Sequence, residues 1–367
     1  MRITKIHYGN LQIPLRTPFK TALRSVDMID DVVICIETDT GHLGFGSAPP
    51  TVAITGESKE SILATLRWHI EPLLLGREIS DLQQLCTLVH NVCEANSSAK
   101  AAAEIAMYDL YAQKQEKPLY QVLGGSNYLL YTDLTMSVNP VEMMLFDCEL
   151  ALDRGFKSLK IKVGKESILD IERLSKIYQF VDGRASIRID ANQGWTPEQT
   201  VLVLQTLENS GMLFELIEQP VLANDVEGLK YIKQRVKTPV LADESAFTLL
   251  QVKNLIARDA VDLINIKLMK TGGLSQAVEI ADYCAAFDKQ CMIGCMLEGA
   301  IGATAAVHFA IAKQHVISKI DLDGPSLGAF NPIDSNVNFN DAVISVIRQA
   351  WVSSKSLMSI GSIKQCE

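Results

Sequence analysis

The pattern of apolar and polar positions changes character near residue 125. Before about residue 60, MRITKIHYGNLQI alternates and DVVICIETDTGHLGFGSA predicts two strands joined at Asp39–Gly41, with a loop, RTPFKTALRSV, between these stretches. From about 58 to 124 the pattern becomes helical, and the alanine-rich EANSSAKAAAEIAMYDLYAQKQ is closed by Pro118 and Gly124–Gly125. Residues 1–125 are therefore predicted to form an α+β unit.

After Gly125, short apolar runs of strand length alternate with stretches of helix length. There are eight such runs: YTDLTMSV, SLKIKV, SIRIDA, FELIEQ, VLADES, LINIKL, CMIGCM and KIDLD. The positions that mark their ends are 24 to 28 residues apart: 162, 190, 218, 243, 267, 294 and 321. This even spacing predicts a closed parallel barrel over residues 126–329. An open doubly wound sheet is the alternative, but it usually has a glycine-rich phosphate turn after its first strand, and none of these strands has one.

Two other features complete this outline of the chain. The tail, residues 330–367, lies beyond the eighth strand and is expected to fold back on the N-terminal unit. The longest weakly polar run, residues 299–312, is too short to span a bilayer and is predicted to be a buried helix.

Composition and charge exclude several classes of function. Among 367 residues, 48% are hydrophobic and 21% charged, and the formal net charge of -9 argues against a nucleic-acid partner. The eight cysteines are scattered without a CxxC pair, which favours reduced thiols in a cytoplasmic protein. None of the six histidines lies beside another candidate ligand, which argues against a zinc site. No membrane segment is predicted.

Carboxylates end three consecutive predicted strands, at Asp190, Glu218 and Asp243. In a barrel the carboxyl ends of the strands meet at one face, so these side chains would repel one another unless a cation lay between them. Oxygen ligands without His or Cys favour Mg²⁺, with Mn²⁺ as a close substitute. Each acid could instead cap the helix that follows it, but three in succession favour the metal.

Lysines flank this predicted metal site. Lys160 and Lys162 are two residues apart on the second strand and point to the same side, and Lys267 ends the sixth strand, across the ring. A neighbouring ammonium and partial burial lower a lysine pKa, so we expect one amine to act as a base. Structural salt bridges are the alternative, which explains neither the symmetry nor the third lysine. Lys270 is interpreted as a supporting or loop residue and not as the base.

The last predicted strand also carries a pair of acids on one face, Asp321 and Asp323. Such a pair could bind a cation such as an amino group. The alternative is a simple turn, because DGP is a good turn signal.

Together these motifs resemble the enolase superfamily, in its muconate-lactonizing-enzyme subgroup. The resemblance rests on KIK, DAN, IEQP, ADES, NIKLMKTGG and AAAEIAMYDLYAQKQEKPLYQVLGG, and it covers essentially the whole chain. It implies an α/β fold, a modified TIM barrel (βα)₇β, with an α+β capping domain completed by the C-terminal tail. It also implies Mg²⁺ on the three acids, Lys162 and Lys267 as the acid/base pair, and Lys160 assisting Lys162 and contacting a substrate carboxylate.

Two segments resemble those of the dipeptide epimerases within this subgroup. DLDGP is similar to the Asp-x-Asp motif that holds a dipeptide's ammonium, and TPFKTALR is similar to a loop whose arginine, here Arg24, meets a glutamate side chain. The resemblance thus implies epimerisation of a dipeptide such as L-Ala-L-Glu, by a homo-oligomer. One departure is Glu298–Gly299, where a small polar residue is expected after the acid.

Two other functions remain as alternatives. O-succinylbenzoate synthases and N-succinylamino acid racemases act on substrates that lack a free ammonium, so Asp321 and Asp323 would serve no purpose there. A barrel that binds ligand without catalysis would be expected to have lost a lysine or a carboxylate, and this chain retains all of them.

Overall fold

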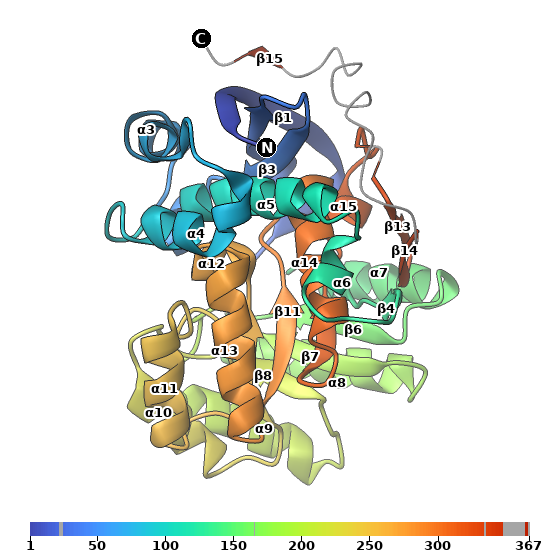
Figure 1. Ribbon diagram of the computed structural model, residues 1–367. Coiled ribbons are helices and arrows are strands. Elements are labelled where there is room, and N and C mark those ends of the chain that lie inside the picture. Colours follow the sequence, from blue (N-terminus) through green and yellow to red (C-terminus); the bar gives the residue numbers. More distant parts are fainter. Residues whose placement is uncertain (22–24, 165, 334, 348–363, 366–367) are drawn as a thin grey trace.

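An antiparallel sheet forms from the alternating segments at the N-terminus (Figure 1). The computed structural model describes residues 1–21, 25–164, 166–333, 335–347 and 364–365. The sheet contains β1 (Ile3–Lys20), β2 (Ser25–Thr38) and β3 (Leu43–Ala48). The predicted turn at Asp39–Gly41 is confirmed. The predicted loop RTPFKTALRSV was wrong at both ends, because β1 and β2 continue into it and pair at Phe19 with Val26.

Short helices and one long helix follow the sheet. They are α1 (Val52–Thr55), α2 (Lys59–Ala64), the π-helix η1 (Thr65–Ile70), α3 (Glu71–Leu74), the 3₁₀ helix η2 (Ile79–Asp81), α4 (Leu82–His90), α5 (Ser97–Lys114) and α6 (Leu119–Val122). The alanine-rich α5 packs closely on β3, where a Cβ on Gly46 would meet the backbone carbonyl of Ala102. Small residues on both elements therefore determine how closely they pack.

Eight parallel strands form the barrel sheet, and all eight predicted strands are confirmed. They are β5 (Leu134–Met136), β6 (Ser158–Lys162), β7 (Ser186–Asp190), β8 (Leu216–Glu218), β9 (Val240–Ala242), β10 (Leu263–Ile266), β11 (Gln290–Gly294) and β12 (Ile317–Asp321). The sheet runs in this order from β5 to β12. The two ends of the sheet, β5 and β12, approach each other. A hydrogen bond from the Asp133 N–H, just before β5, to the Ile320 carbonyl on β12 (3.3 Å) joins them.

Helices connect successive strands of this sheet. They are α7 (Val141–Asp153), α8 (Ser167–Val181), α9 (Pro197–Asn209), α10 (Val226–Lys233), α11 (Leu249–Ala257), α12 (Leu268–Thr271) with α13 (Leu274–Ala286), and α14 (Ala300–Ala312). Seven strand–helix units followed by a last strand confirm the predicted (βα)₇β arrangement. The helix predicted over 299–312 is α14, which is apolar on all sides because it is buried almost throughout. No helix in the described ranges has the length and apolar character needed to cross a membrane.

The chain beyond β12 pairs with segments from both parts of the molecule. After α15 (Gly324–Leu327), the strands β13 (Val337–Asn340) and β14 (Val343–Val346) form a small sheet with β4 (Leu129–Tyr131). The two-residue β15 (Lys364–Gln365) pairs with β1. The domain boundaries near residues 125 and 330 remain a prediction.

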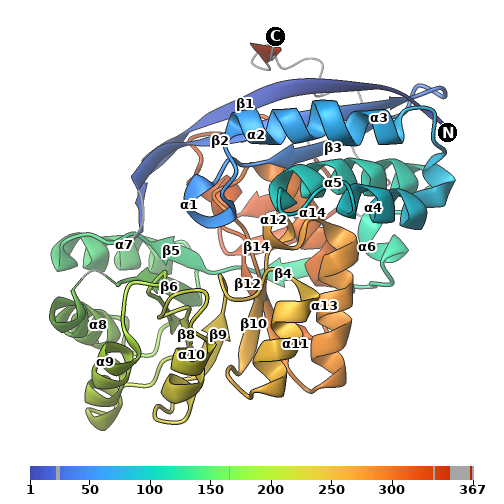
Figure 2. The same cartoon turned by 90° about the vertical axis from the view of Figure 1, so that its left-hand side faces the viewer.

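The N-terminal sheet lies over one end of the barrel (Figure 2). At this junction Asp31 on β2 accepts a hydrogen bond from the Gly299 N–H, at the start of α14 (2.9 Å). A Cβ on Gly299 would lie 3.1 Å from the same Asp31 oxygen, so glycine leaves room for this contact. Burial raises the pKa of Asp31 to about 7, and burial together with Asp31 raises the pKa of Glu298 to about 8. Glu298 and Gly299, which depart from the pattern expected of the resembled family, thus take part in the contact between the N-terminal sheet and the barrel.

We expect Gly46→Ala to destabilise the protein by more than about 3 kcal/mol, because the new methyl group meets helix backbone that cannot yield. Gly41→Ala is the control, since a Cβ there meets nothing within 4 Å although φ is +77°. It should cost about 1 kcal/mol from backbone strain alone. Urea unfolding followed by circular dichroism measures the free energy of unfolding of both variants. Equal losses of stability in the two variants would contradict the close packing of β3 on α5.

Asp31→Asn should stabilise the protein more at pH 8 than at pH 5. The folded protein holds a proton on Asp31 up to about pH 7, whereas the unfolded chain releases it near pH 4, so stability falls as the pH rises through this window. The substitution removes this penalty, which is at most about 4 kcal/mol. Thermal unfolding at both pH values measures the difference. Asp27→Asn, at an exposed position on the same strand, is the control and should show no such dependence on pH. If Asp31→Asn stabilised the protein equally at both pH values, the prediction would be contradicted.

Candidate active site

The lysines of β6 and the lysine after β10 line one pocket at the carboxyl ends of the barrel strands. The pocket contains Lys160, Lys162 and Lys267, and the N-terminal part of the chain contributes Phe19 and Ile54 to its wall. Lys162 Nζ donates to Asp190 Oδ2 at 2.6 Å and Lys267 Nζ to Asp243 Oδ2 at 2.7 Å. The structure therefore places amines from β6 and β10 at a common cavity.

The three acids predicted as metal ligands are fully buried on neighbouring strands. Asp190 and Glu218 are register partners on β7 and β8, and Asp243 directly follows β9. Their oxygens are joined through ammonium groups, since Lys160 Nζ lies 3.1 Å from Asp190 and 2.7 Å from Glu218. Lys270 Nζ lies 2.6 Å from Asp243 Oδ1. The acids thus share one face and are compensated by lysines.

The donor chemistry of these acids suits a divalent cation, although their oxygens do not all lie within 4.8 Å of one another. All their donor atoms are hard oxygens, the type that Mg²⁺ prefers. The adjacent Glu244 is buried, and neither of its carboxylate oxygens has a hydrogen-bond partner among the described residues. Burial and the charge of Asp243 raise the pKa of Glu244 to about 8, and burial and Asp190 raise that of Glu218 to about 7. Such an excess of buried carboxylate is what a cation would compensate.

The expected lowering of a lysine pKa is wrong for Lys160 and Lys267 in this structure. Burial lowers the pKa of Lys267, but the charges of Asp243 and Glu218 more than offset it and hold the pKa above its ordinary value. The pKa of Lys160 is raised for the same reason, by Asp321 and Glu218 against burial. A neighbouring ammonium and burial each lower a lysine pKa, but the carboxylates around these two amines outweigh both.

Two supporting residues hold the acids in place. Lys270, interpreted as a supporting residue, also donates to the carbonyls of Asp243 (2.6 Å) and Asn265 (2.8 Å). Asn265, which the sequence argument missed, donates to Glu218 Oε1 at 2.7 Å. Its signal was its position two residues before Lys267 on β10, which puts both side chains on the same side of the sheet.

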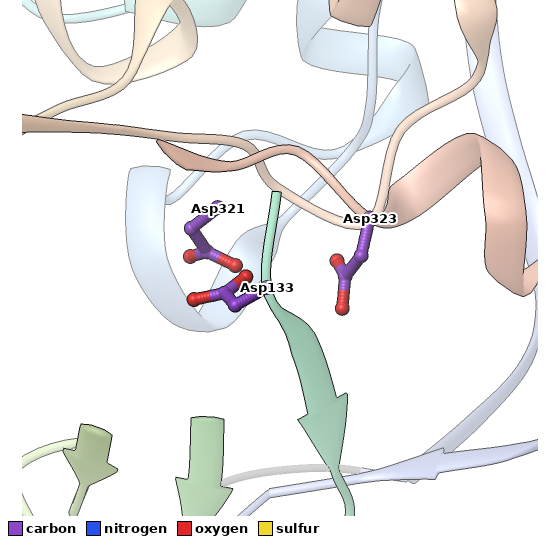
Figure 3. A group of neighbouring side chains, drawn as sticks. All are labelled: Asp133, Asp321 and Asp323. Atoms are coloured by element: carbon purple, nitrogen blue, oxygen red, sulfur yellow. The ribbon is translucent and has the colours of Figure 1, made fainter. Parts of the chain in front are cut away.

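Asp133, Asp321 and Asp323 form a second acidic group, which is shown in Figure 3. Asp321 and Asp323 both line the pocket, and Lys160 Nζ donates to Asp321 Oδ2 at 2.7 Å. Asp133, which the sequence argument missed, lies next to them, and each of the three offers an oxygen within 4.8 Å of the others. This spacing suits a cation. Arg24 lies outside the described residues.

Comparisons with known proteins agree with this geometry. Residues 4–124 match the N-terminal domain of the mandelate racemase / muconate lactonizing enzyme family, and residues 144–349 match the enolase C-terminal domain-like family. The chain belongs to this enolase-superfamily group, so the predicted family is confirmed.

Within this family, the chain is similar to several epimerases that act on dipeptides. The chain is 45% identical to an L-Ala-D/L-Glu epimerase of Clostridium acetobutylicum, over 95% of this chain and 97% of the relative. It is similar to a substrate-liganded L-Ala-D/L-Glu epimerase of Bacillus subtilis (TM-score 0.93, 40% identity, 95% and 98% of the two chains). It is also similar to a dipeptide epimerase of Enterococcus faecalis complexed with Mg and L-Leu-L-Tyr (TM-score 0.91, 36% identity, 95% and 98%).

We expect Asp243→Asn and Glu218→Gln each to lower the affinity for Mg²⁺ at least about tenfold, because each removes a buried negative oxygen donor. Titration calorimetry with Mg²⁺ alone measures this without turnover. Glu215→Gln is the control, a carboxylate bound to Arg188 and Lys319 at the other end of the barrel. If Mg²⁺ affinity survived both substitutions and was lost with Asp133→Asn, the metal would belong to the second acidic group.

Proposed function

We propose that this protein is a Mg²⁺-dependent dipeptide epimerase that inverts the α-carbon of the C-terminal residue, with L-Ala-L-Glu as the representative substrate. The observation that carries the proposal is the pair of buried amines, Lys162 from β6 and Lys267 after β10, at one pocket. The named relatives support it, because they are epimerases of dipeptides and one is a complex with Mg.

The two amines can exchange protons with a carbon bound between them. One lysine, in its neutral form, removes the α-proton, and the opposite lysine returns a proton to the other face. Mg²⁺, when bound, supplies positive charge that stabilises the negative charge developing on the substrate carboxylate. Lys160, which is almost fully buried, adds a fixed ammonium next to this carboxylate.

The carboxylates that raise the pKa values of Lys160 and Lys267 include acids that a cation would compensate. Asp190 accepts from Lys162 and Asp243 accepts from Lys267, so each proposed base is paired with a proposed metal ligand. Positive charge on these acids weakens their hold on the ammonium form of each lysine. Metal binding and base strength are thus coupled through these two ion pairs.

The acids at the end of β12 favour a substrate with a free amino group. Asp321 and Asp323 line the same pocket as the lysines. A succinylated substrate has no ammonium there, and its negative group would be repelled. This argues against the o-succinylbenzoate synthase and N-succinylamino acid racemase reactions, and the retained lysines and acids argue against a binding protein without activity.

Four finer features complete the proposal, two from the pattern of the sequence and two from the resemblance. Mn²⁺ as a substitute for Mg²⁺, the homo-oligomeric state, the cytoplasmic location and a contact between Arg24 and a glutamate side chain belong to this proposal. Size-exclusion chromatography with light scattering tests the oligomeric state. Arg24→Met tests the glutamate contact, since it should weaken L-Ala-L-Glu more than L-Ala-L-Leu.

Lys162→Ala and Lys267→Ala should each lower epimerisation by more than about 10³-fold, because each removes one of the two proton-transfer groups. Each variant is expected to exchange the α-proton of one epimer only. Incubation of L-Ala-L-Glu and L-Ala-D-Glu with Mg²⁺ in deuterated water measures exchange by mass and inversion by chiral chromatography.

The control for this experiment is Lys313→Ala, which removes a surface amine that pairs with Asp282. It should keep full activity. Full turnover by either of the two site variants would contradict the two-base reaction.

A further inference from the structure

Asp133, Asp321 and Asp323 form a buried acidic cluster where the two ends of the barrel sheet meet. Asp133 precedes β5, whereas Asp321 ends β12 and Asp323 follows it. The three residues are at most 4% exposed. Figure 3 shows the Asp133 carboxylate facing that of Asp321, with Asp323 on the other side of β5. Three carboxylates this close require positive charge or protons between them.

The cations available to the cluster are shared with other acids. Lys160 binds Asp321 but also Glu218, at 2.7 Å each. Arg188 binds Asp133 Oδ2 at 2.6 Å but also Glu215 at 2.7 Å. Neither cation is therefore available to the cluster alone.

One fully buried oxygen of the cluster has no hydrogen-bond partner among the described residues. Asp323 Oδ2 accepts the Thr135 N–H at 2.8 Å, and the Oδ2 atoms of Asp321 and Asp133 accept from Lys160 and Arg188. Asp133 Oδ1 is buried and has no hydrogen-bond partner among the described residues. An orphaned buried carboxylate oxygen is costly unless a proton or a ligand's charge compensates it.

Two of the three acids favour their protonated forms, whereas the pKa of Asp321 is lowered, because the effect of burial is outweighed by the charges of Lys160 and Lys267. Burial and Asp321 raise the pKa of Asp133 against the opposing charge of Arg188, and burial and Asp321 raise the pKa of Asp323 to about 6. The thiol of Cys295 also faces the two acids of β12, and burial raises its pKa as well. A cation that entered here would replace a proton.

We propose that Asp133 is a positioning residue of the subsite that receives the substrate's ammonium, and that its charge makes this subsite bind a free ammonium in preference to an acylated amino group. Asp133 does not line the pocket, whereas Asp321 and Asp323 do, so it acts through them. Its backbone and its Arg188 partner both bond to the Ile320 carbonyl, which holds the end of β12 against β5. The inference rests on the proposed function, in which the substrate is a dipeptide with a free amino end.

Equilibrium binding to the Mg²⁺-loaded protein tests this role. The two probes are L-Ala-Glu, supplied as an equilibrium mixture of its epimers so that no net turnover adds heat, and its N-acetyl derivative. Asp133→Asn should weaken binding of the free dipeptide about tenfold or more and change binding of the acetylated one less than about twofold, because only the ammonium responds to the lost charge.

Glu215→Gln is the matched control, because it removes the other acid bound to Arg188 and leaves the cluster intact. It should retain the preference for the free amine. An equal loss for both probes in Asp133→Asn would indicate a merely structural role and overturn the proposal, as would unchanged binding. A second Mg²⁺ bound per chain and lost with Asp133→Asn would assign the cluster to a metal and also overturn it.

A measurement on the unaltered protein keeps the proposal testable if Asp133→Asn does not fold. Binding of L-Ala-Glu near pH 6.5 should release more protons than binding of the acetylated peptide, measured by calorimetry in buffers of different ionisation enthalpy. Equal proton release would overturn the proposal. Deuterium exchange at the α-carbon is assayed separately, so a protein that prefers the free amine without exchanging the proton would refute the epimerase and not the subsite.

Discussion

The compensation of buried charge at the carboxyl ends of the barrel strands is the constraint on which the site depends. Lys160, Lys162, Lys267 and Lys270 are all at least 94% buried, among acids that are buried as deeply. None of these groups could be ionised alone in such a place, because the cost of removing a charge from water is too high without a partner. The parallel strands solve this by bringing acids from β7, β8 and β9 to the same level as amines from β6 and β10. A fold that closes into a ring is what makes such alternation of charge possible.

The need to compensate buried charge connects the stability of the fold to the proton transfer proposed for the lysines. Each proposed base donates a hydrogen bond to an acid that is also a proposed metal ligand, so the charge of that acid influences the base strength of the lysine. Positive charge that enters from outside, as a divalent cation or as a substrate ammonium, alters which groups hold protons. The acids therefore stabilise the fold and control the proton affinity of the lysines at once.

The N-terminal part of the chain contributes to the same site from outside the barrel. Its sheet is brought onto the barrel by α14, which is apolar all round, and by the contact between Asp31 and Gly299. Phe19 and Ile54 reach the wall of the pocket from this side. Their side chains reduce access of water to the lysines, which strengthens every ion pair within the site.

The sequence was enough to predict the eight strands, the (βα)₇β order and the family, because an even spacing of apolar runs and acids at their ends are local and periodic signals. It also placed Lys160 and Lys162 on one side of a strand, since the side-chain period of a strand is two. It could not predict that the carboxylates raise the lysine pKa values, nor that Asp133 and Asn265 belong to the site. Those outcomes depend on which strands lie side by side and on how barrel closure brings the start of β5 against the end of β12. Only the tertiary structure decides such distances, because residues almost 190 positions apart, such as Asp133 and Asp321, meet there and electrostatic energy depends on separation in space.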